Sequence, residues 1–401
     1  MTAPAVPSTH VEKLVDRQFM LVCTSVLMFF LAVGINLPLV AKYVKGPLGQ
    51  GDDIVGTAAA SLSIAAVLIR PVVALVSGRF GSRTLMAVGG AIGVVGFALQ
   101  VAPALPWFIA ARMLAGIGDA AIFVGASTMI VSAAPIARRA EATSYLSVAV
   151  FGGLGIGPVF GDALAAGGHY NRSFVAASMC CAGAVVAALM VGPLPVAMDR
   201  DGAPANGLKD SRPGWFHRKG VRPGIVLALS MAGYVGWVTF QPLRAIEIGL
   251  KGGQVFAIYA ACTLTLRLIG AKVPERVGLM RCCGGAITVM SGGLVLCSVA
   301  TSKLTFVVGT VVLSCGMAFV YPALAAMAVN TVSIAEQAAL VPTFTAFFEI
   351  GPAIGGYPLG LVARAFGYRT VLLVCAVTTL CGLPALLSFR HSRADSVVET
   401  P

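Results

Sequence analysis

The sequence has few charged residues and fewest of the acidic kind. Asp, Glu, Lys and Arg make up 11% of its 401 residues, with 16 acidic against 28 basic side chains, whereas soluble domains contain about 25% charged residues. Hydrophobic residues make up 58%. This composition excludes a soluble globular enzyme, a disordered regulator and a fibrous repeat, and it predicts a chain that lies mostly in a lipid bilayer.

The sequence also lacks the residue clusters of metal, redox and catalytic sites. Its ten cysteines form no Cys-x-x-Cys pair and mostly fall in apolar runs, where small buried side chains are the simplest interpretation. The four histidines (His10, His169, His217 and His391) fall in predicted loops or tails. We therefore expect no enzyme activity, no metal and no cofactor.

Twelve apolar segments are long enough to cross the hydrocarbon core as helices, which takes about 20 residues. Because backbone polar groups in lipid must bond within their own segment, we expect an all-α membrane protein. The predicted spans are Phe19–Val40, Ile54–Ser77, Thr84–Ala104, Trp107–Val131, Ala142–Ala166, Ser173–Val196, Gly224–Ala245, Gln254–Val273, Cys283–Ala300, Leu304–Val329, Ala338–Leu361 and Val371–Ser388.

The basic residues indicate how the chain is oriented. With both termini inside, roughly twice as many Lys and Arg fall in inner segments as in outer ones, as the positive-inside rule requires. The net charge of +12 is thus explained by loops facing anionic lipid, and we expect no nucleic-acid partner. The polar start of the chain lacks the pattern of a cleavable signal peptide. These features predict a multi-pass protein of the plasma (inner) membrane with cytoplasmic termini.

The longest internal polar stretch, residues 197–222, is predicted to be a cytoplasmic linker. It divides the chain into a six-helix bundle at 19–196 and another at 223–389. Residues 1–18 and 390–401 are then cytoplasmic tails.

The two bundles repeat each other in sequence. Arg70 and the segment Gly78-Arg79-Phe80-Gly81 recur 197 residues later as Arg267 and Glu275-Arg276-Val277-Gly278. Two further glycines recur at an offset of 198: Gly118 as Gly316, and Gly157 as Gly355. Two pseudo-symmetric six-helix bundles are the architecture of a secondary transporter, which binds its substrate near the bilayer midplane between the halves.

Several motifs resemble those of the major facilitator superfamily. The segment Ala74 to Arg83 is similar to the family loop Gly-x-x-x-Asp-Arg-x-Gly-Arg-Arg: Arg79, Gly81 and Arg83 match it, and Ala74, Gly78 and Ser82 depart from it. Residues 112–118 resemble the family's Arg-x-x-x-Gly-x-Gly element in the fourth helix. The resemblance implies a cytoplasmic gate in which a loop acid bridges the halves, a role that only Glu275, in the second copy, could fill.

Two other motifs resemble one branch of that superfamily. Residues 153–161 are similar to the Gly-Pro motif of proton-coupled drug exporters, with Gly153, Gly157, Pro158 and Gly161 as its members. Close helix packing is the alternative explanation for these glycines. Arg70-Pro71 resembles the drug- and sugar-efflux-like permeases. This resemblance implies a proton antiporter.

Five charged residues fall inside predicted spans, where each costs about 2.5–3.5 kcal/mol on insertion scales and so indicates function. They are Arg70, Arg112, Asp119, Arg267 and Glu349. Arg112 and Asp119 lie two helical turns apart on one face, about 10 Å along the axis, which suits a shared polar cavity. Asp119 and Glu349 are the candidate proton carriers. The family fold implies that the second helix lies against the eleventh and the fifth against the eighth.

We therefore predict that Arg70 pairs with Glu349 across the halves in one state and separates from it in another. Static ion pairs that only permit membrane insertion are the alternative. Further side chains of the first, fourth, seventh and tenth helices are candidates to face the substrate. They are Asn36, Phe123, Tyr234, Trp237, Phe240, Gln241 and Tyr321, and a cavity of this character suits amphipathic organic molecules.

The leading prediction is a monomeric, proton-coupled exporter of a small amphipathic solute, whose partners are substrate, protons and lipid. A second prediction is a permease for an organic or inorganic anion held by Arg70 and Arg267. A third is a membrane receptor that binds a ligand without transporting it.

Overall fold

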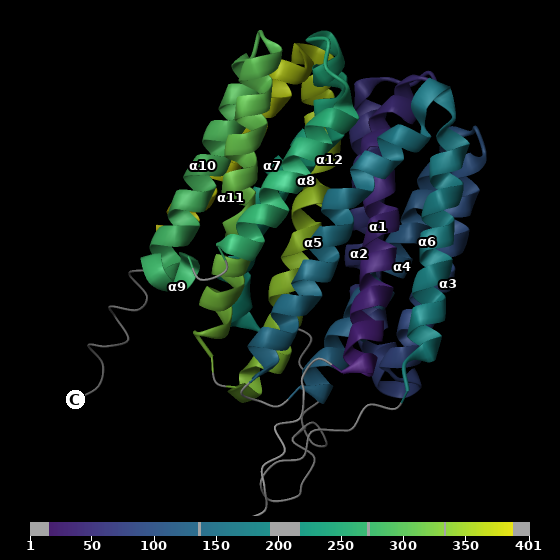
Figure 1. The fold of residues 1–401 in the computed structure, drawn as a ribbon, viewed down its shortest axis with the longest axis vertical. Coiled ribbons are helices and arrows are strands. Elements are labelled where there is room, and N and C mark those ends of the chain that lie inside the picture. Colours follow the sequence, from purple (N-terminus) through teal and green to yellow (C-terminus); the bar gives the residue numbers. More distant parts are fainter. Residues whose placement is uncertain (1–15, 135–137, 193–216, 271–272, 333, 388–401) are drawn as a thin grey trace, which may run out of the picture.

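The computed structural model describes residues 16–134, 138–192, 217–270, 273–332 and 334–387, and these are almost entirely helical (Figure 1). The predicted linker 197–222 and both tails lie largely outside these ranges. The helices are α1 (Arg17–Lys45), α2 (Asp52–Phe80), α3 (Ser82–Ala98), α4 (Leu105–Ala133), α5 (Arg139–Leu164), α6 (Tyr170–Met190), α7 (Arg218–Glu247), α8 (Gly252–Ile269), α9 (Val273–Val277), α10 (Leu279–Val299), α11 (Lys303–Val329) and α12 (Ile334–Leu380). Short 3-10 turns, η1 (Leu99–Val101) and η3 (Ala166–Gly168), follow α3 and α5.

Eleven helical segments of the described chain are long and apolar enough to cross a membrane. The last of them, Leu340–Leu387, is 48 residues long because α12 contains two predicted spans separated by a kink at Gly367. At this glycine φ is 77° and ψ is 174°, values outside the helical region. The prediction of an all-α membrane protein with twelve spans in two halves is confirmed.

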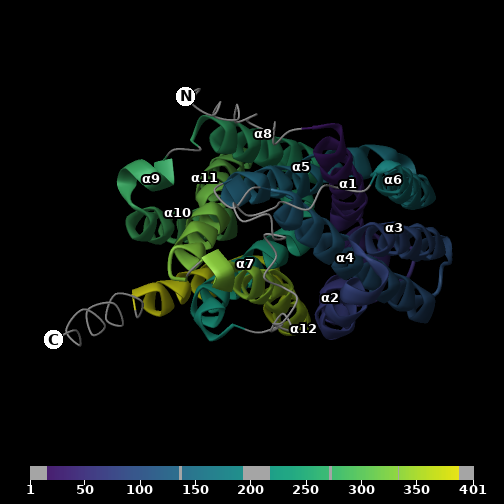
Figure 2. The same cartoon turned by 90° about the horizontal axis from the view of Figure 1, so that it is seen from below.

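Each half is a bundle with the same internal neighbours. In the first half α1 packs on α5 and α3 packs on α4; in the second half α7 packs on α12 and α10 packs on α11. Figure 2 shows α1–α6 on one side of the molecule and α7–α12 on the other. The halves meet where α2 lies against α12 and α5 lies against α8, as the family resemblance implies.

The turns between helices repeat as well. Every residue with positive φ in the described chain is a glycine, and these glycines form equivalent sets in the two halves: Gly49 and Gly249, Gly81 and Gly278, and Gly167–Gly168 and Gly367. Gly81 and Gly278 have φ of 80° and 91°, and a Cβ at either would meet no atom within 4 Å. Glycine is therefore favoured there by backbone conformation rather than by lack of space.

Inside each bundle, equivalent glycines bring helices into close contact. A Cβ at Gly118 would lie 2.6 Å from the carbonyl oxygen of Gly89, and one at Gly316 would lie 2.5 Å from that of Ala286. The two contacted residues, Gly89 and Ala286, are themselves 197 positions apart in the sequence. The α3–α4 and α10–α11 contacts are therefore equivalent. Small residues at helix crossings are the main device by which membrane helices pack tightly.

Candidate functional site

A cavity lies at the interface between the halves. In this conformation its volume is about 30 Å³, which is room for about two water molecules. Its lining residues come from α1, α2, α4, α5, α11 and α12, so both bundles contribute. They are Phe30, Arg70, Asp119, Phe123, Ser147, Val150, Phe151, Tyr321, Thr345, Phe348 and Glu349.

Three of the five predicted intramembrane charges share this cavity. Asp119 on α4 and Glu349 on α12 are 3% and 7% exposed, and both act electrostatically on Arg70 of α2. Ser63, about two turns before Arg70 on α2, lies close to Glu349 across the interface. The structure thus brings Arg70 and Glu349 together from opposite halves, in the arrangement that their hypothetical pairing needs.

Arg70 is not fully satisfied by these neighbours. Its Nε and Nη1 atoms are buried, and the described part of the chain offers them no hydrogen-bond partner. The guanidinium carbon lies 5.7 Å from the centroid of the Phe123 ring, close enough for a cation–π contact. Among the described residues Arg70 forms no direct ion pair, so its charge is held by the field of two carboxyl groups and one ring.

Arg267, the sequence equivalent of Arg70, lies on α8 beside Phe151, a residue that lines the cavity, and is not itself among the lining residues. Its guanidinium carbon is 3.7 Å from the centroid of the Phe151 ring of α5. Its electrostatic neighbours are the hydroxyl groups of Tyr259, Tyr321 and Tyr234. Tyr321 acts on both arginines and lines the cavity together with Ser147 of the other half.

Arg112 lies outside the lining of the cavity. From α4 its Nε donates to the carbonyl oxygen of Ala58 at 2.5 Å and its Nη2 to that of Ala59 at 3.3 Å. Its Nη1 donates to Oδ1 of Asn36 at 3.2 Å. Arg112 and Asp119 were predicted to share a polar cavity, but only Asp119 lines it. The hydrogen bonds of Arg112 instead join α4 to α1 and α2.

Of the side chains predicted to face the substrate, Phe123 and Tyr321 line the cavity and the others pack elsewhere in this conformation. Asn36 is buried against Arg112. Tyr234 and Trp237 pack on each other, with ring centroids 6.3 Å apart, inside the second bundle. Phe240 stacks on Tyr368 of α12 at 6.1 Å.

The loop-motif residues lie where α2 gives way to α3 and, in the second half, in α9 and at Gly278 directly after it. Arg79 is exposed and its guanidinium carbon lies 5.7 Å from the centroid of the Phe80 ring. Arg83 donates to the carbonyl oxygen of Leu189, which ties the start of α3 to the end of α6. Arg276 is exposed, and the side chain of Glu275 lies outside the described part of the structure.

The Gly-Pro motif of α5 lies along α1. A Cβ at Gly153, Gly157 or Gly161 would come within 2.6 Å of the backbone of α1, and Pro158 lies inside the helix. This geometry agrees with close helix packing as the structural role of the glycines.

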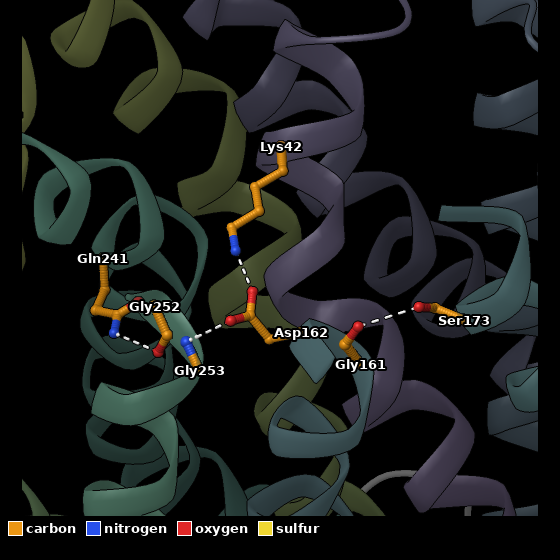
Figure 3. Close-up of polar contacts among 7 residues, drawn as sticks. All are labelled: Lys42, Gly161, Asp162, Ser173, Gln241, Gly252 and Gly253. Atoms are coloured by element: carbon orange, nitrogen blue, oxygen red, sulfur yellow. Dashed lines mark hydrogen bonds and ion pairs between the residues drawn. The ribbon is translucent and has the colours of Figure 1, made fainter. Parts of the chain in front are cut away.

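Sequence analysis did not identify the contacts that join the halves at one end of the molecule, where α1 finishes at Lys45. We call this the distal end. Asp162, at the end of α5, forms an ion pair with Lys42 and accepts a hydrogen bond from the backbone N–H of Gly253 at 2.8 Å (Figure 3). Gly253 lies in the first turn of α8, so a carboxylate of the first half caps a helix of the second. Nearby, Nε2 of the predicted substrate residue Gln241 donates to the carbonyl oxygen of Gly252 at 3.2 Å.

A second set of distal contacts joins α1 and α2 to α12. Lys45 donates to Oδ1 of Asp52 at 2.8 Å and to the hydroxyl of Tyr368 at 2.6 Å. Arg364 pairs with Asp53 at 3.2 Å. The residues that form these distal contacts fall in predicted outer loops or at the ends of predicted spans. The one sequence feature that could have indicated the contacts is the acidic residue Asp162, directly after the Gly-Pro segment.

Twelve spanning helices in two matched bundles, with a charged cavity between them, define a membrane transporter. The chain belongs to the Major Facilitator Superfamily, whose family model matches residues 22–339 and 247–400. The predicted superfamily is thus confirmed, while the efflux-like proton antiporter branch stays a prediction.

Bacterial relatives match nearly the whole chain. An uncharacterized MFS-type transporter of Salmonella typhimurium is 26% identical over 369 residues, which cover 88% of this chain and 91% of the relative. An uncharacterized MFS-type transporter of Burkholderia mallei is 25% identical over 407 residues, covering 98% of this chain and 97% of the relative. These relatives favour the plasma membrane as the location, and the orientation of the termini stays a prediction.

Solved structures share the fold at low sequence identity. A bacterial homologue of the human lysosomal transporter Spinster, in an inward-facing and occupied conformation, has a TM-score of 0.74 at 14% identity, covering 94% of this chain and 96% of its own. The nucleoside transporter NupG has a TM-score of 0.71 at 15% identity, covering 93% and 99%. The human organic anion transporter MFSD10 has a TM-score of 0.68 at 16% identity, covering 92% and 99%.

Proposed function

We propose that this member of a family of small-solute transporters is a proton-coupled exporter of a small amphipathic organic molecule. The observation that carries the proposal is the meeting of Arg70, Asp119 and Glu349 in one cavity, with Arg70 and Asp119 in the first half and Glu349 in the second. Titratable side chains inside a membrane are costly and are typical of proton pathways. The rings of Phe123, Phe151 and Phe348 offer apolar walls to an organic solute.

Proton binding at these carboxyl groups would change the attraction between the halves. When Glu349 or Asp119 is ionised, it attracts Arg70, and Glu349 does so across the α2–α12 interface. A proton on Glu349 removes the negative charge that attracts Arg70 across this interface, so the protein protonated at Glu349 would separate the halves more readily. A proton on Asp119 weakens only an attraction within the first half. Alternating access then follows if substrate and proton favour different arrangements of the bundles.

The conformation of the distal end supports a cycle of this kind. The contacts of Asp162, Lys45 and Arg364 join the halves at that end. If the termini are cytoplasmic, as we propose, this end faces outward and the conformation described here is closed to the outside. The small cavity volume of about 30 Å³ indicates that the bundles must move apart before an organic solute can enter.

Flux measurements in proteoliposomes test the proposal. We expect an imposed pH gradient to drive accumulation of fluorescent amphipathic probes, and Glu349→Gln or Asp119→Asn to reduce gradient-driven flux at least about tenfold. Downhill exchange of the probe should persist, because these variants lose the coupling and keep the pathway. Glu247→Gln is the matched control, since Glu247 is half-exposed and pairs with Arg244 at the end of α7. Wild-type flux that ignores the pH gradient would refute proton coupling.

A further inference from the structure

The two equivalent arginines have different electrostatic surroundings. Arg70 has two carboxyl groups, Asp119 and Glu349, among its neighbours. Arg267 has tyrosine hydroxyls only, and it forms no ion pair within the described part of the chain. Both halves therefore have an arginine at the equivalent position, but only Arg70 has acidic side chains beside it.

Arg267 is also left with unused hydrogen-bonding capacity. Its Nε and Nη2 atoms are buried and have no hydrogen-bond partner among the residues that the structure describes. The Phe151 ring covers one face of the guanidinium, which stabilises the charge but accepts none of the in-plane N–H groups. A buried hydrogen-bond donor without an acceptor is unfavourable. The donors of Arg267 are therefore satisfied only when a bound molecule provides an acceptor.

The guanidinium group restricts what that acceptor is. Its planar fork of N–H groups matches a carboxylate, phosphate or sulfonate in two parallel hydrogen bonds. The neighbouring side chains Phe151 and Tyr321 line the cavity, so an anionic group at Arg267 would place the rest of its molecule among aromatic rings.

We propose that Arg267 binds the anionic group of the substrate, and that the substrate is an organic anion with an apolar, aromatic-sized body. This inference rests on the proposed function and assigns its substrate class: Arg70 serves the two proton-carrying acids, and Arg267 serves the solute. In the earlier alternative Arg70 and Arg267 together hold an anion. Here only Arg267 binds the anion, because it has no acidic side chain beside it.

Binding to the purified full-length protein in detergent tests this assignment. The probes are 2-naphthoate and naphthalene-2-sulfonate, with uncharged 2-naphthol and cationic 2-naphthylmethylamine as matched bodies, and the measurement is each probe's Kd. We expect the two anions to bind at least about tenfold more tightly than the other two, the size of one charge-assisted hydrogen bond. Arg267→Gln should abolish the preference, and Arg172→Gln, which removes an exposed arginine of α6, should retain it.

A second variant covers the case in which Arg267→Gln does not fold. Arg267→Lys keeps the charge and loses the fork, so the preference for the anions should fall several-fold and remain above one. Equal binding of all four probes, no binding of either anion, or an unchanged preference in Arg267→Gln or Arg267→Lys would overturn the proposal.

The failure of this inference can be separated from failure of the proposed function. If a pH gradient drives uncharged or cationic probes through the wild-type protein and Arg267→Gln does not impair them, proton-coupled export stands and the anion site does not. If the anions bind through Arg267 and no probe responds to a pH gradient, the anion site stands and proton coupling does not.

Discussion

Asp162 and Gly253 are joined by a hydrogen bond of 2.8 Å between a carboxylate of one half and a backbone N–H of the other. The same carboxylate is paired with Lys42, so one side chain links three helices at the distal end. Because the bond is charge-assisted and crosses the interface, it stabilises only those states in which the distal end is closed.

We expect Asp162→Ala, which removes the acceptor oxygens of the side chain, to shift the protein towards states that are open at the distal end. Loss of a hydrogen bond to a charged group costs about 1.5–3 kcal/mol, so the open population should rise at least about tenfold. The measurement is the distance distribution between spin labels at the distal ends of the two halves, in a variant without native cysteines.

Arg364→Gln is the matched control for this shift. Arg364 also pairs across the halves, with Asp53, but its side chain is 68% exposed. Exposed ion pairs contribute about 0–1 kcal/mol, so its loss should move the distribution little. An equal shift in both variants would contradict a special role for Asp162.

Gly157→Ala should destabilise the first bundle. A Cβ at this position would lie 2.6 Å from Cα of Gly34 on α1, and the two helices would have to separate, at a cost of about 1–3 kcal/mol. Thermal unfolding in detergent measures the effect. Gly152→Ala on the same helix is the control, because its Cβ would lie 3.6 Å from the nearest atom, a side-chain carbon of Leu27; comparable losses in both variants would argue against the packing explanation.

Gly81→Ala and Gly278→Ala should destabilise the protein by similar amounts. Both positions combine positive φ with extended ψ (80° and 151° at Gly81, 91° and 133° at Gly278) and have open space around them, so the penalty is a backbone conformation that L-residues rarely adopt, about 1–3 kcal/mol. Gly292→Ala provides the comparison: it lies inside α10 with open space around it, and alanine there should be neutral or stabilising. Unequal effects at the two turns, measured as shifts in unfolding temperature, would count against their structural equivalence.

Arg112→Lys should lower stability and leave the pH dependence of transport unchanged. A lysine keeps the charge but cannot reach the carbonyl groups of Ala58 and Ala59 and the amide of Asn36 together. Thermal unfolding and the pH profile of flux should be measured on the same preparation. A changed pH profile with normal stability would place Arg112 in the proton pathway.

The number of spans and the two-half architecture could be predicted from sequence, because hydropathy and the recurring Arg and Gly positions are properties of the chain itself. The kink at Gly367, for example, falls between two predicted spans. The convergence of Arg70 and Glu349 was predictable only with the helix order implied by the family, since the two residues lie 279 positions apart.

The direction in which each side chain points could not be predicted, because it depends on how each helix is rotated in its bundle. Arg112 and Asp119 lie on one face of α4, yet only Asp119 lines the cavity. Gln241 and Phe240 were expected in the cavity, and they contact Gly252 and Tyr368. The hydropathy of a helix that is apolar on all sides carries little information about its rotation.

Each bundle has its own positive-φ glycines at turns where the chain reverses direction, and these turns are equivalent in the two bundles. Gly49 and Gly249 lead from the first helix of a bundle to the second, and Gly81 and Gly278 from the second to the third. A polypeptide ending after Met190 and another beginning at Arg218 would each still contain glycines at the same three turns. Synthesised as two separate pieces in one membrane, they should fold independently and then dock along the α2–α12 and α5–α8 surfaces.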